Sequence, residues 1–152
     1  MPIQLVVENL NASIDDKVVL HDLAVTAQAG HILALMGKGG CGKSTFLRVI
    51  NRMAEEGGAV VSGHIMLDNS SIFMQDISLL RQKVGMVFTE PVLFAGNILG
   101  NITAGLRLQG IKKKQKLEEC AEETLGYMGI LEEFRDLLYT DASYLNRSQA
   151  QL

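Results

Sequence analysis

The sequence has few cysteines and no long apolar run, and each of these absences excludes a class of protein. Two cysteines, Cys41 and Cys120, are too few for a disulfide framework, and their spacing does not suggest a metal site. No apolar stretch approaches the ~18 to 20 residues that span a bilayer. The N-terminus lacks the basic segment and apolar core of a secretory signal. We therefore expect a cytoplasmic protein.

A surplus of basic charge is also absent. The net charge is -3 and the isoelectric point is near 5.6, so composition gives no reason to expect nucleic-acid binding. The longest charge run is "KKKQK" at residues 112–116. It opens a predicted helix, which favours a solvated face over an anion-binding patch. With 47% apolar residues in a chain of 152, we expect a globular protein with a hydrophobic core.

Several segments of the N-terminal part have the composition of β-strands. Residues 3–10 and 17–27 are rich in β-branched side chains and flank the turn-forming sequence "NASIDD", which predicts a hairpin. Residues 59–69 predict a second short hairpin. "HILALM" at residues 31–36 and "VGMVF" at residues 84–88 are nearly continuous apolar runs, the pattern of strands buried on both faces.

Helical spacing appears first after the apolar run at residues 31–36 and then dominates the last fifty residues of the chain. Apolar residues predict a helix from Lys43 that ends near Gly57 and Gly58. Residues 76–83 predict one or two helical turns, and the pattern is helical from Asn101 onward. The order of these elements predicts an α/β fold with an appended helical subdomain.

A glycine-rich loop separates the apolar run at residues 31–36 from the predicted helix. Gly37, Gly42, Lys43 and Ser44 match the P-loop pattern G-x-x-x-x-G-K-[ST], and Thr45 follows. Glycines let the backbone approach a polyphosphate closely and point successive N–H groups at it. The helix that starts at Lys43 adds the positive end of its dipole, and the lysine adds a full charge.

The whole loop is therefore predicted to bind a nucleotide phosphate chain. The predicted binding residues are Gly37, Lys38, Gly39, Gly40, Cys41, Gly42, Lys43, Ser44 and Thr45. The hydroxyl of Ser44 is the predicted Mg²⁺ ligand. Cys41 is interpreted as a small residue whose backbone N–H matters more than its sulfur. Its position before a helix would also suit a reactive thiol.

The segments around the loop follow one another in an order that belongs to one family. They are "ENLNASIDDKVVLHDLAVTAQAGHILALMGKGGCGKSTFLRVINRM", "GHIMLDN", "LLRQKVGMVFTEPVLFAGNILGNITAGLRL" and "GILEEFRDLLYTDASYLNRSQAQL". In this order they resemble the N-terminal part of the ATP-binding subunits of ABC transporters. Arg52 and Met53, together with the last segment, make the chain most similar to the phosphate-import type.

This resemblance implies a P-loop NTPase core of the α/β class with an antiparallel β hairpin subdomain. It implies that residues 1–152 form one partial nucleotide-binding domain, with a β-rich core at 1–100 and a helical subdomain at 101–152. The implied cofactors are ATP and Mg²⁺. The implied location is the inner face of the cell membrane, where the segment Pro91–Ile98 contacts membrane subunits of an importer.

At three places the sequence departs from the pattern of the family. Ile14 stands where the family stacks adenine on an aromatic residue, which predicts weaker and less selective adenine binding. Thr89 takes the catalytic position of the family's Q-loop glutamine, but its side chain is shorter. The signature L-S-G-G-Q becomes Leu145–Gln149, where Arg147 replaces a glycine.

The sequence also contains no Walker B strand and no switch histidine, which in the family complete the catalytic arrangement. His21, His31 and His64 lie at strand or hairpin positions and do not replace it. We therefore expect this chain by itself to bind ATP without hydrolysing it. We also expect an incomplete central sheet, because "HILALM" lacks a neighbouring strand. Self-association, or docking with a second nucleotide-binding chain, would cover that edge.

Two functions stay open on the sequence alone. The first is the ATP-binding subunit of an importer, with inorganic phosphate as the solute. The second is a truncated or degenerate nucleotide-binding protein that binds ATP and does not hydrolyse it. An unrelated P-loop kinase or GTPase fits less well, because the N-K-x-D guanine motif is absent and the helical tail follows the ABC order. Phosphate release from Mg-ATP, measured beside nucleotide binding, separates the first two.

Overall fold

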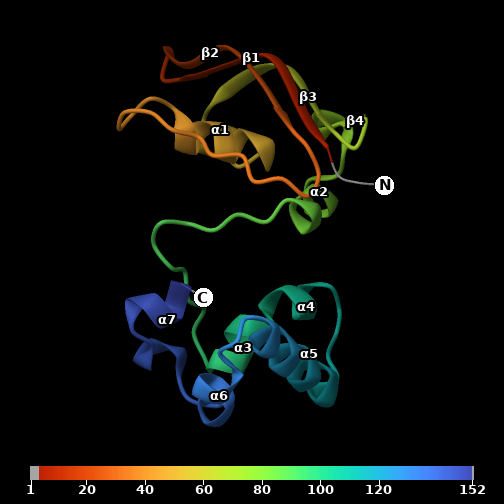
Figure 1. The fold of residues 1–152 in the computed structure, drawn as a ribbon, viewed down its shortest axis with the longest axis vertical. Helices are drawn as coiled ribbons and strands as arrows, with labels where there is room; N and C mark the ends of the chain where they lie inside the picture. The colour runs from red at the N-terminus through yellow and green to blue at the C-terminus, as the bar shows by residue number, and fades with distance from the viewer. Residues whose placement is uncertain (1–3, 152) are drawn as a thin grey trace. The chain divides into compact units, whose positions relative to one another are not determined.

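The computed structural model describes residues 4–151. The chain divides between Val87 and Phe88 into two compact units. The first unit contains all the strands of the described residues and the second is helical (Figure 1). The structure therefore combines an antiparallel β-sheet with helices, in agreement with the predicted α/β class.

The sheet of the first unit has four strands and is antiparallel throughout. Strand β1 (Leu5–Ile14) forms a hairpin with β2 (Lys17–Ala27) and pairs on its other side with β3 (Val60–Leu67), which pairs with β4 (Ser70–Ser71). The first predicted hairpin is therefore confirmed. The second was predicted within residues 59–69, where the structure has the single strand β3, and its partner β4 lies just after that range. The turns between β1 and β2 and between β3 and β4 consist of Asp and Asn residues with positive φ, the conformation that tight hairpin turns require.

One hydrophobic core holds this sheet to helix α1 (Lys43–Ile50), which lies against one face of the strands (Figure 1). The side chains at its centre come from β1, α1 and β3 and are almost inaccessible to solvent: Val7, Leu10, Phe46, Val49 and Ile65. Full burial of side chains of this size stabilises a fold by ~1.5–3 kcal/mol each. The core therefore fixes the position of α1 and of the glycine-rich loop that precedes it.

Helix α1 is shorter than the sequence predicted. It ends at Ile50, and Arg52 follows with a positive φ of 58°. Arg81, from helix α2 (Ile77–Lys83), donates hydrogen bonds of 3.1 Å to the carbonyl oxygens of Asn51 and Arg52. The expected stop at Gly57 and Gly58 closes only a separate turn of 3₁₀ helix. The helix itself is closed by backbone hydrogen bonds, such as that from the amide of Met53 to the carbonyl of Arg48 at 2.8 Å. Arg81 holds the two residues that follow it.

The two apolar runs at residues 31–36 and 84–88 are not strands, and this prediction was wrong. Both segments have no regular secondary structure, and Ile32, Met36 and Val87 have exposed fractions of 100%, 91% and 81%. A strand exists only where its backbone groups pair with a neighbour. Among residues 4–151 the only sheet is the antiparallel one, and neither segment pairs with it.

The second unit confirms the predicted helices. They are α3 (Ile98–Ile102), α4 (Ala104–Leu108), α5 (Lys114–Tyr127), α6 (Leu131–Phe134) and α7 (Arg147–Gln151). They pack around a core of their own, which includes Leu99, Leu125 and Phe134. Of the helices described, none has the length and apolar character that a bilayer crossing requires.

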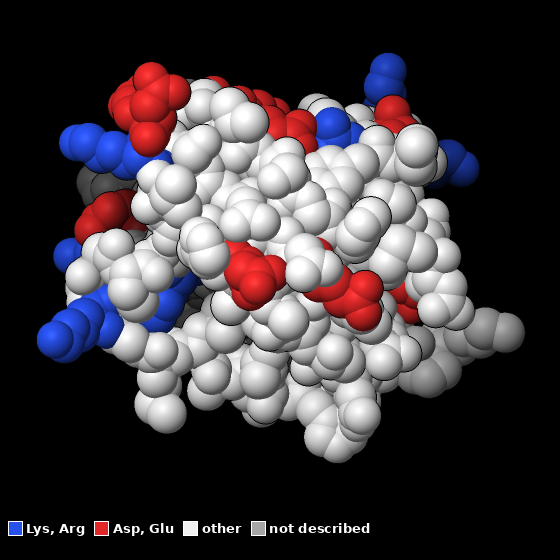
Figure 2. Space-filling view, turned by 90° about the horizontal axis from the view of Figure 1, so that it is seen from above, with Lys and Arg blue, Asp and Glu red and all other residues white. Residues whose placement is uncertain are grey.

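Figure 2 shows the surface of the molecule as seen from the top of Figure 1. On this face acidic side chains are scattered among uncharged ones, and Lys and Arg side chains stand at its margins.

Candidate functional site

The glycine-rich loop lies directly before α1 in the first unit. Gly42 is the N-cap of α1 and has a left-handed conformation, with φ of 90°. A Cβ atom at this position would lie 2.8 Å from the carbonyl oxygen of Val19 and 2.8 Å from a methyl group of Leu20. Glycine is therefore required twice here, for the backbone conformation and for the close approach of the loop to β2.

The loop encloses the amine of Lys43. The Nζ atom donates hydrogen bonds of 2.8 Å to the carbonyl oxygens of Gly37 and Lys38 and lies 3.4 Å from Sγ of Cys41. An ammonium group has three donors, so two are held by carbonyls and the third faces sulfur, a weak acceptor. The positive charge is therefore fixed inside the curve of the loop with one donor poorly satisfied.

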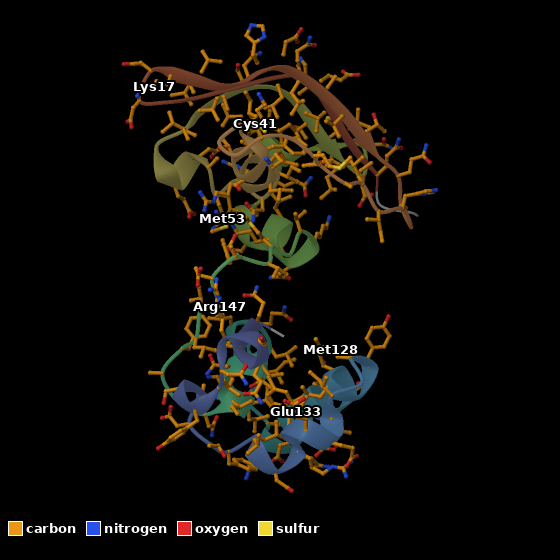
Figure 3. All side chains as sticks on the ribbon, turned by 60° about the vertical axis from the view of Figure 1, so that its left-hand side comes forward. Lys17, Cys41, Met53, Met128, Glu133 and Arg147 are labelled. Atoms are coloured by element: carbon orange, nitrogen blue, oxygen red, sulfur yellow. The ribbon has the colours of Figure 1, made fainter. Side chains whose placement is uncertain are left out.

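Cys41, labelled in Figure 3, lies on the side of the loop that faces the Lys43 amine. Its Sγ atom would lie 2.7 Å from a Cβ atom at Gly37, so a larger residue at position 37 would displace the thiol from its place. The thiol is exposed and forms no disulfide within the described residues 4–151. The first glycine of the motif thus lets the two sides of the loop approach each other.

The N-terminus of α1 differs from those of α2 and α3 (Ile98–Ile102). No side chain caps it, and its first turn has no acidic residue. By contrast, Asp76 caps α2 through the amide of Leu79, and Asn97 caps α3 through the amide of Gly100. The leading amides of α1 and its positive dipole end therefore remain available to an external anion.

Ser44 and Thr45 occupy the first turn of α1, with Ser44 exposed and Thr45 partly buried. Within residues 4–151 no group of three or more His, Cys, Asp or Glu side chains is arranged to hold a metal ion. A cation at this loop would therefore depend on the Ser44 hydroxyl and on oxygens of a bound ligand. The Mg²⁺ role of Ser44 stays a prediction.

Thr89, the predicted catalytic position, belongs to the second unit. It is exposed in a non-helical segment next to Glu90, whose carboxylate forms an ion pair with Arg147. The other predicted site residues, 37–45, belong to the first unit. Its role stays a prediction.

The segment Leu145–Gln149 has a local structure that the sequence analysis missed. The amide of Gln149 donates to Oδ1 of Asn146 at 3.0 Å, and the amide of Asn146 donates to Oε1 of Gln149 at 3.1 Å. This reciprocal pair is a capping box that starts α7. The spacing N-x-x-Q was a signal that could have predicted it.

Comparison with protein families gives a match over most of the chain. Residues 20–146 match the family model described as "ABC transporter". The matched range contains the whole loop at residues 37–45 and most of the helical unit.

Comparison with curated proteins finds relatives that include phosphate import ATP-binding proteins. The chain is 37% identical over 148 residues to phosphate import ATP-binding protein PstB 1 of Vibrio parahaemolyticus, which covers 95% of this chain and 54% of that protein. It is 38% identical over 147 residues to phosphate import ATP-binding protein PstB of Borreliella afzelii, covering 95% and 56%. A Yersinia pestis PstB 1 is 37% identical over 154 residues, covering 97% and 56%. The chain thus spans about half the length of the curated relatives it matches.

Proposed function

The chain belongs to the ABC transporter family, and from this premise we propose that it acts as the ATP-binding subunit of an importer whose solute is inorganic phosphate. The printed names of its relatives support the solute. The family match and the loop geometry support nucleotide binding. In this proposal residues 1–152 form one partial nucleotide-binding domain with a P-loop core, a β hairpin subdomain and a helical subdomain.

The proposal of nucleotide binding rests on one observation, the position of the Lys43 amine inside a loop that leads into a helix without a side-chain cap. The ammonium is held by the carbonyls of Gly37 and Lys38, and the free amides at the start of α1 lie beside it in sequence. The loop amides from Gly37 to Thr45 would surround the phosphate chain of ATP, and Lys43 would neutralise part of its charge. Bound Mg²⁺ would supply further charge neutralisation, with Ser44 as its ligand from this chain.

The proposed membrane subunits would contact the segment Pro91–Ile98. Within the second unit its backbone is held by Asn101, whose amide side chain exchanges two hydrogen bonds with Phe94, at 2.7 and 3.0 Å. Val92 and Phe94 nevertheless expose 69% and 61% of their surface. A fixed segment that presents apolar side chains to solvent suits a docking surface. This contact would place the subunit at the inner face of the membrane, with a second nucleotide-binding chain as a further partner.

Equilibrium binding of a fluorescent ATP analogue tests the proposal. We expect Lys43→Ala to weaken binding by at least about tenfold, because a charge-assisted contact to phosphate is lost. Lys83→Ala, which removes the same charge from the last turn of α2, is the matched control and should leave the affinity within about twofold. Equal affinities for the two variants would contradict nucleotide binding by this loop.

A further inference from the structure

The connection between α4 and α5 concentrates positive charge in an otherwise acidic chain. The basic residues of this stretch have no acidic residue between them and are all exposed: Arg107, Lys112, Lys113, Lys114 and Lys116. The chain as a whole carries a net charge of -3. Positive charge is therefore concentrated in residues 107–116, which lie far from the glycine-rich loop in the sequence.

The turn after α4 brings three of these residues to one hollow. The amide of Ile111 donates to the carbonyl of Leu106, and the amide of Gly110 donates to that of Arg107, both at 3.0 Å. These bonds reverse the chain, and a hollow of about 360 Å³ lies beside the turn. Its lining residues are Leu99, Arg107, Ile111, Lys112, Lys114 and Leu117.

The hollow has an apolar floor and a cationic rim. Leu99 and Leu117 are buried, with exposed fractions of 3% and 4%, so they belong to the packed interior of the unit. Arg107, Lys112 and Lys114 supply every charged side chain of the lining, and all three are cations. Such a volume accommodates a small ligand with charge at one end.

Two of the three rim cations have no acidic partner within residues 4–151. No ion pair involves Arg107 or Lys112 there. Lys114 lies 3.6 Å from Glu118 and 5.0 Å from the centre of the Tyr139 ring, and its side chain is 73% exposed. An exposed pair of this kind contributes little and is easily exchanged for another anion.

The orientation of α5 adds to the positive potential. Its N-terminus has no side-chain cap and no acidic residue in the first turn, although lysines occupy that turn. Lysines at the positive end of a helix dipole disfavour the helix by a few tenths of a kcal/mol each. A bound anion would relieve this unfavourable arrangement.

We propose that Arg107, Lys112 and Lys114 form a binding site for a phosphate-bearing anion, either a free phosphate compound or a phospholipid headgroup. The sequence alone favoured a solvated face at residues 112–116. The hollow changes that interpretation, because it singles out Lys112 and Lys114 from the other lysines of the run. The site is separate from the glycine-rich loop and does not depend on the proposed function.

Site-resolved NMR titration of the full chain with inorganic pyrophosphate tests the free ligand. We expect the amide resonances of residues 110–117 to shift with saturation, separately from any shift at residues 37–45. The same shifts at residues 110–117 should persist in Lys43→Ala, since that variant affects only the loop. Absence of saturable shifts at residues 110–117 counts against a free ligand.

Two double variants with the same charge change provide the decisive control. Lys112→Gln/Lys114→Gln removes rim cations and should weaken pyrophosphate binding by at least about tenfold. Lys113→Gln/Lys116→Gln removes lysines outside the lining and should change it by less than about threefold. Equal weakening by the two pairs would overturn the site, because diffuse charge would then explain the binding. Circular dichroism checks that both variants keep their helices.

Co-sedimentation with vesicles tests the headgroup as the source. We compare phosphatidylcholine vesicles with vesicles that also contain phosphatidylglycerol, using the same two double variants. Binding to the anionic vesicles that only Lys112→Gln/Lys114→Gln abolishes supports a headgroup ligand. Selective loss in the pyrophosphate titration alone supports a free phosphate compound. Failure of both ligands to bind overturns the proposal.

Discussion

The first unit draws its order from hydrogen bonds between strands far apart in the chain, whereas the second unit draws it from helices that satisfy their own backbones. Strand β1 pairs with β3 across about fifty intervening residues, while α5 forms its bonds within one continuous segment. The segments at residues 31–36 and 84–87 lie in the first unit and expose apolar side chains such as Ile32, Met36 and Val87. Helices therefore form from local sequence, while strands of buried type stay unpaired until a neighbouring strand is present.

The largest expected effect concerns the separate cores. Phe46 and Phe134 are each 3% exposed and belong to different hydrophobic clusters. We expect Phe46→Ala and Phe134→Ala each to lower the free energy of unfolding of its own unit by about 3–5 kcal/mol. Hydrogen exchange measures this, with amides of β1 losing protection in the first variant and amides of α5 in the second. Loss of protection in both units from either variant would show that they unfold together.

A smaller effect is expected at the start of α7, where it tests whether local contacts stabilise the helices of the second unit. Asn146→Ala removes one half of the capping box, and we expect the start of α7 to lose about 1 kcal/mol. The exchange rate of the Gln149 amide measures the loss. Ser148→Ala, in the same turn and with no side-chain hydrogen bond among residues 4–151, should change that rate by less than half as much. A larger effect from Ser148→Ala would contradict the assigned cap.

The smallest expected effect concerns the unpaired segment of the first unit. Ile32 is fully exposed, so Ile32→Ser should change the free energy of unfolding by less than about 0.5 kcal/mol. It should also reduce self-association in light scattering, because an exposed apolar segment is removed. Ile65→Ser is the control, since Ile65 is 0% exposed and its loss should destabilise the sheet. A destabilisation by Ile32→Ser that approaches that of Ile65→Ser would show that residues 31–36 are packed in solution.

Much of the fold was predictable because its signals are local. The turn residues Asp15 and Asp16 mark the first hairpin, and the apolar spacing of α5 marks the longest helix. Two features depended on distant partners and were missed. The conformation of the two residues after α1 involves Arg81, which lies about thirty residues further on. The state of residues 31–36 depends on whether a neighbouring strand exists.

Part of the candidate site was also predictable from local sequence, and part was not. The spacing of Gly37, Gly42 and Lys43 identified the loop, because close backbone approach demands particular residue types at particular positions. The spacing did not predict that the lysine amine folds back onto the carbonyls of Gly37 and Lys38. The hollow beside Lys112 was also invisible in the sequence, because it requires the chain reversal after α4.

The amine of Lys43 holds the glycine-rich loop in its curved form before any ligand arrives. Loops rich in glycine lose much conformational entropy when they become ordered. Here that loss accompanies folding, so it does not have to be repeated at each binding event. In the proposed nucleotide binding, an incoming polyanion would exchange partners with a lysine already in place, and its affinity would reflect contact strength more than the cost of ordering the loop.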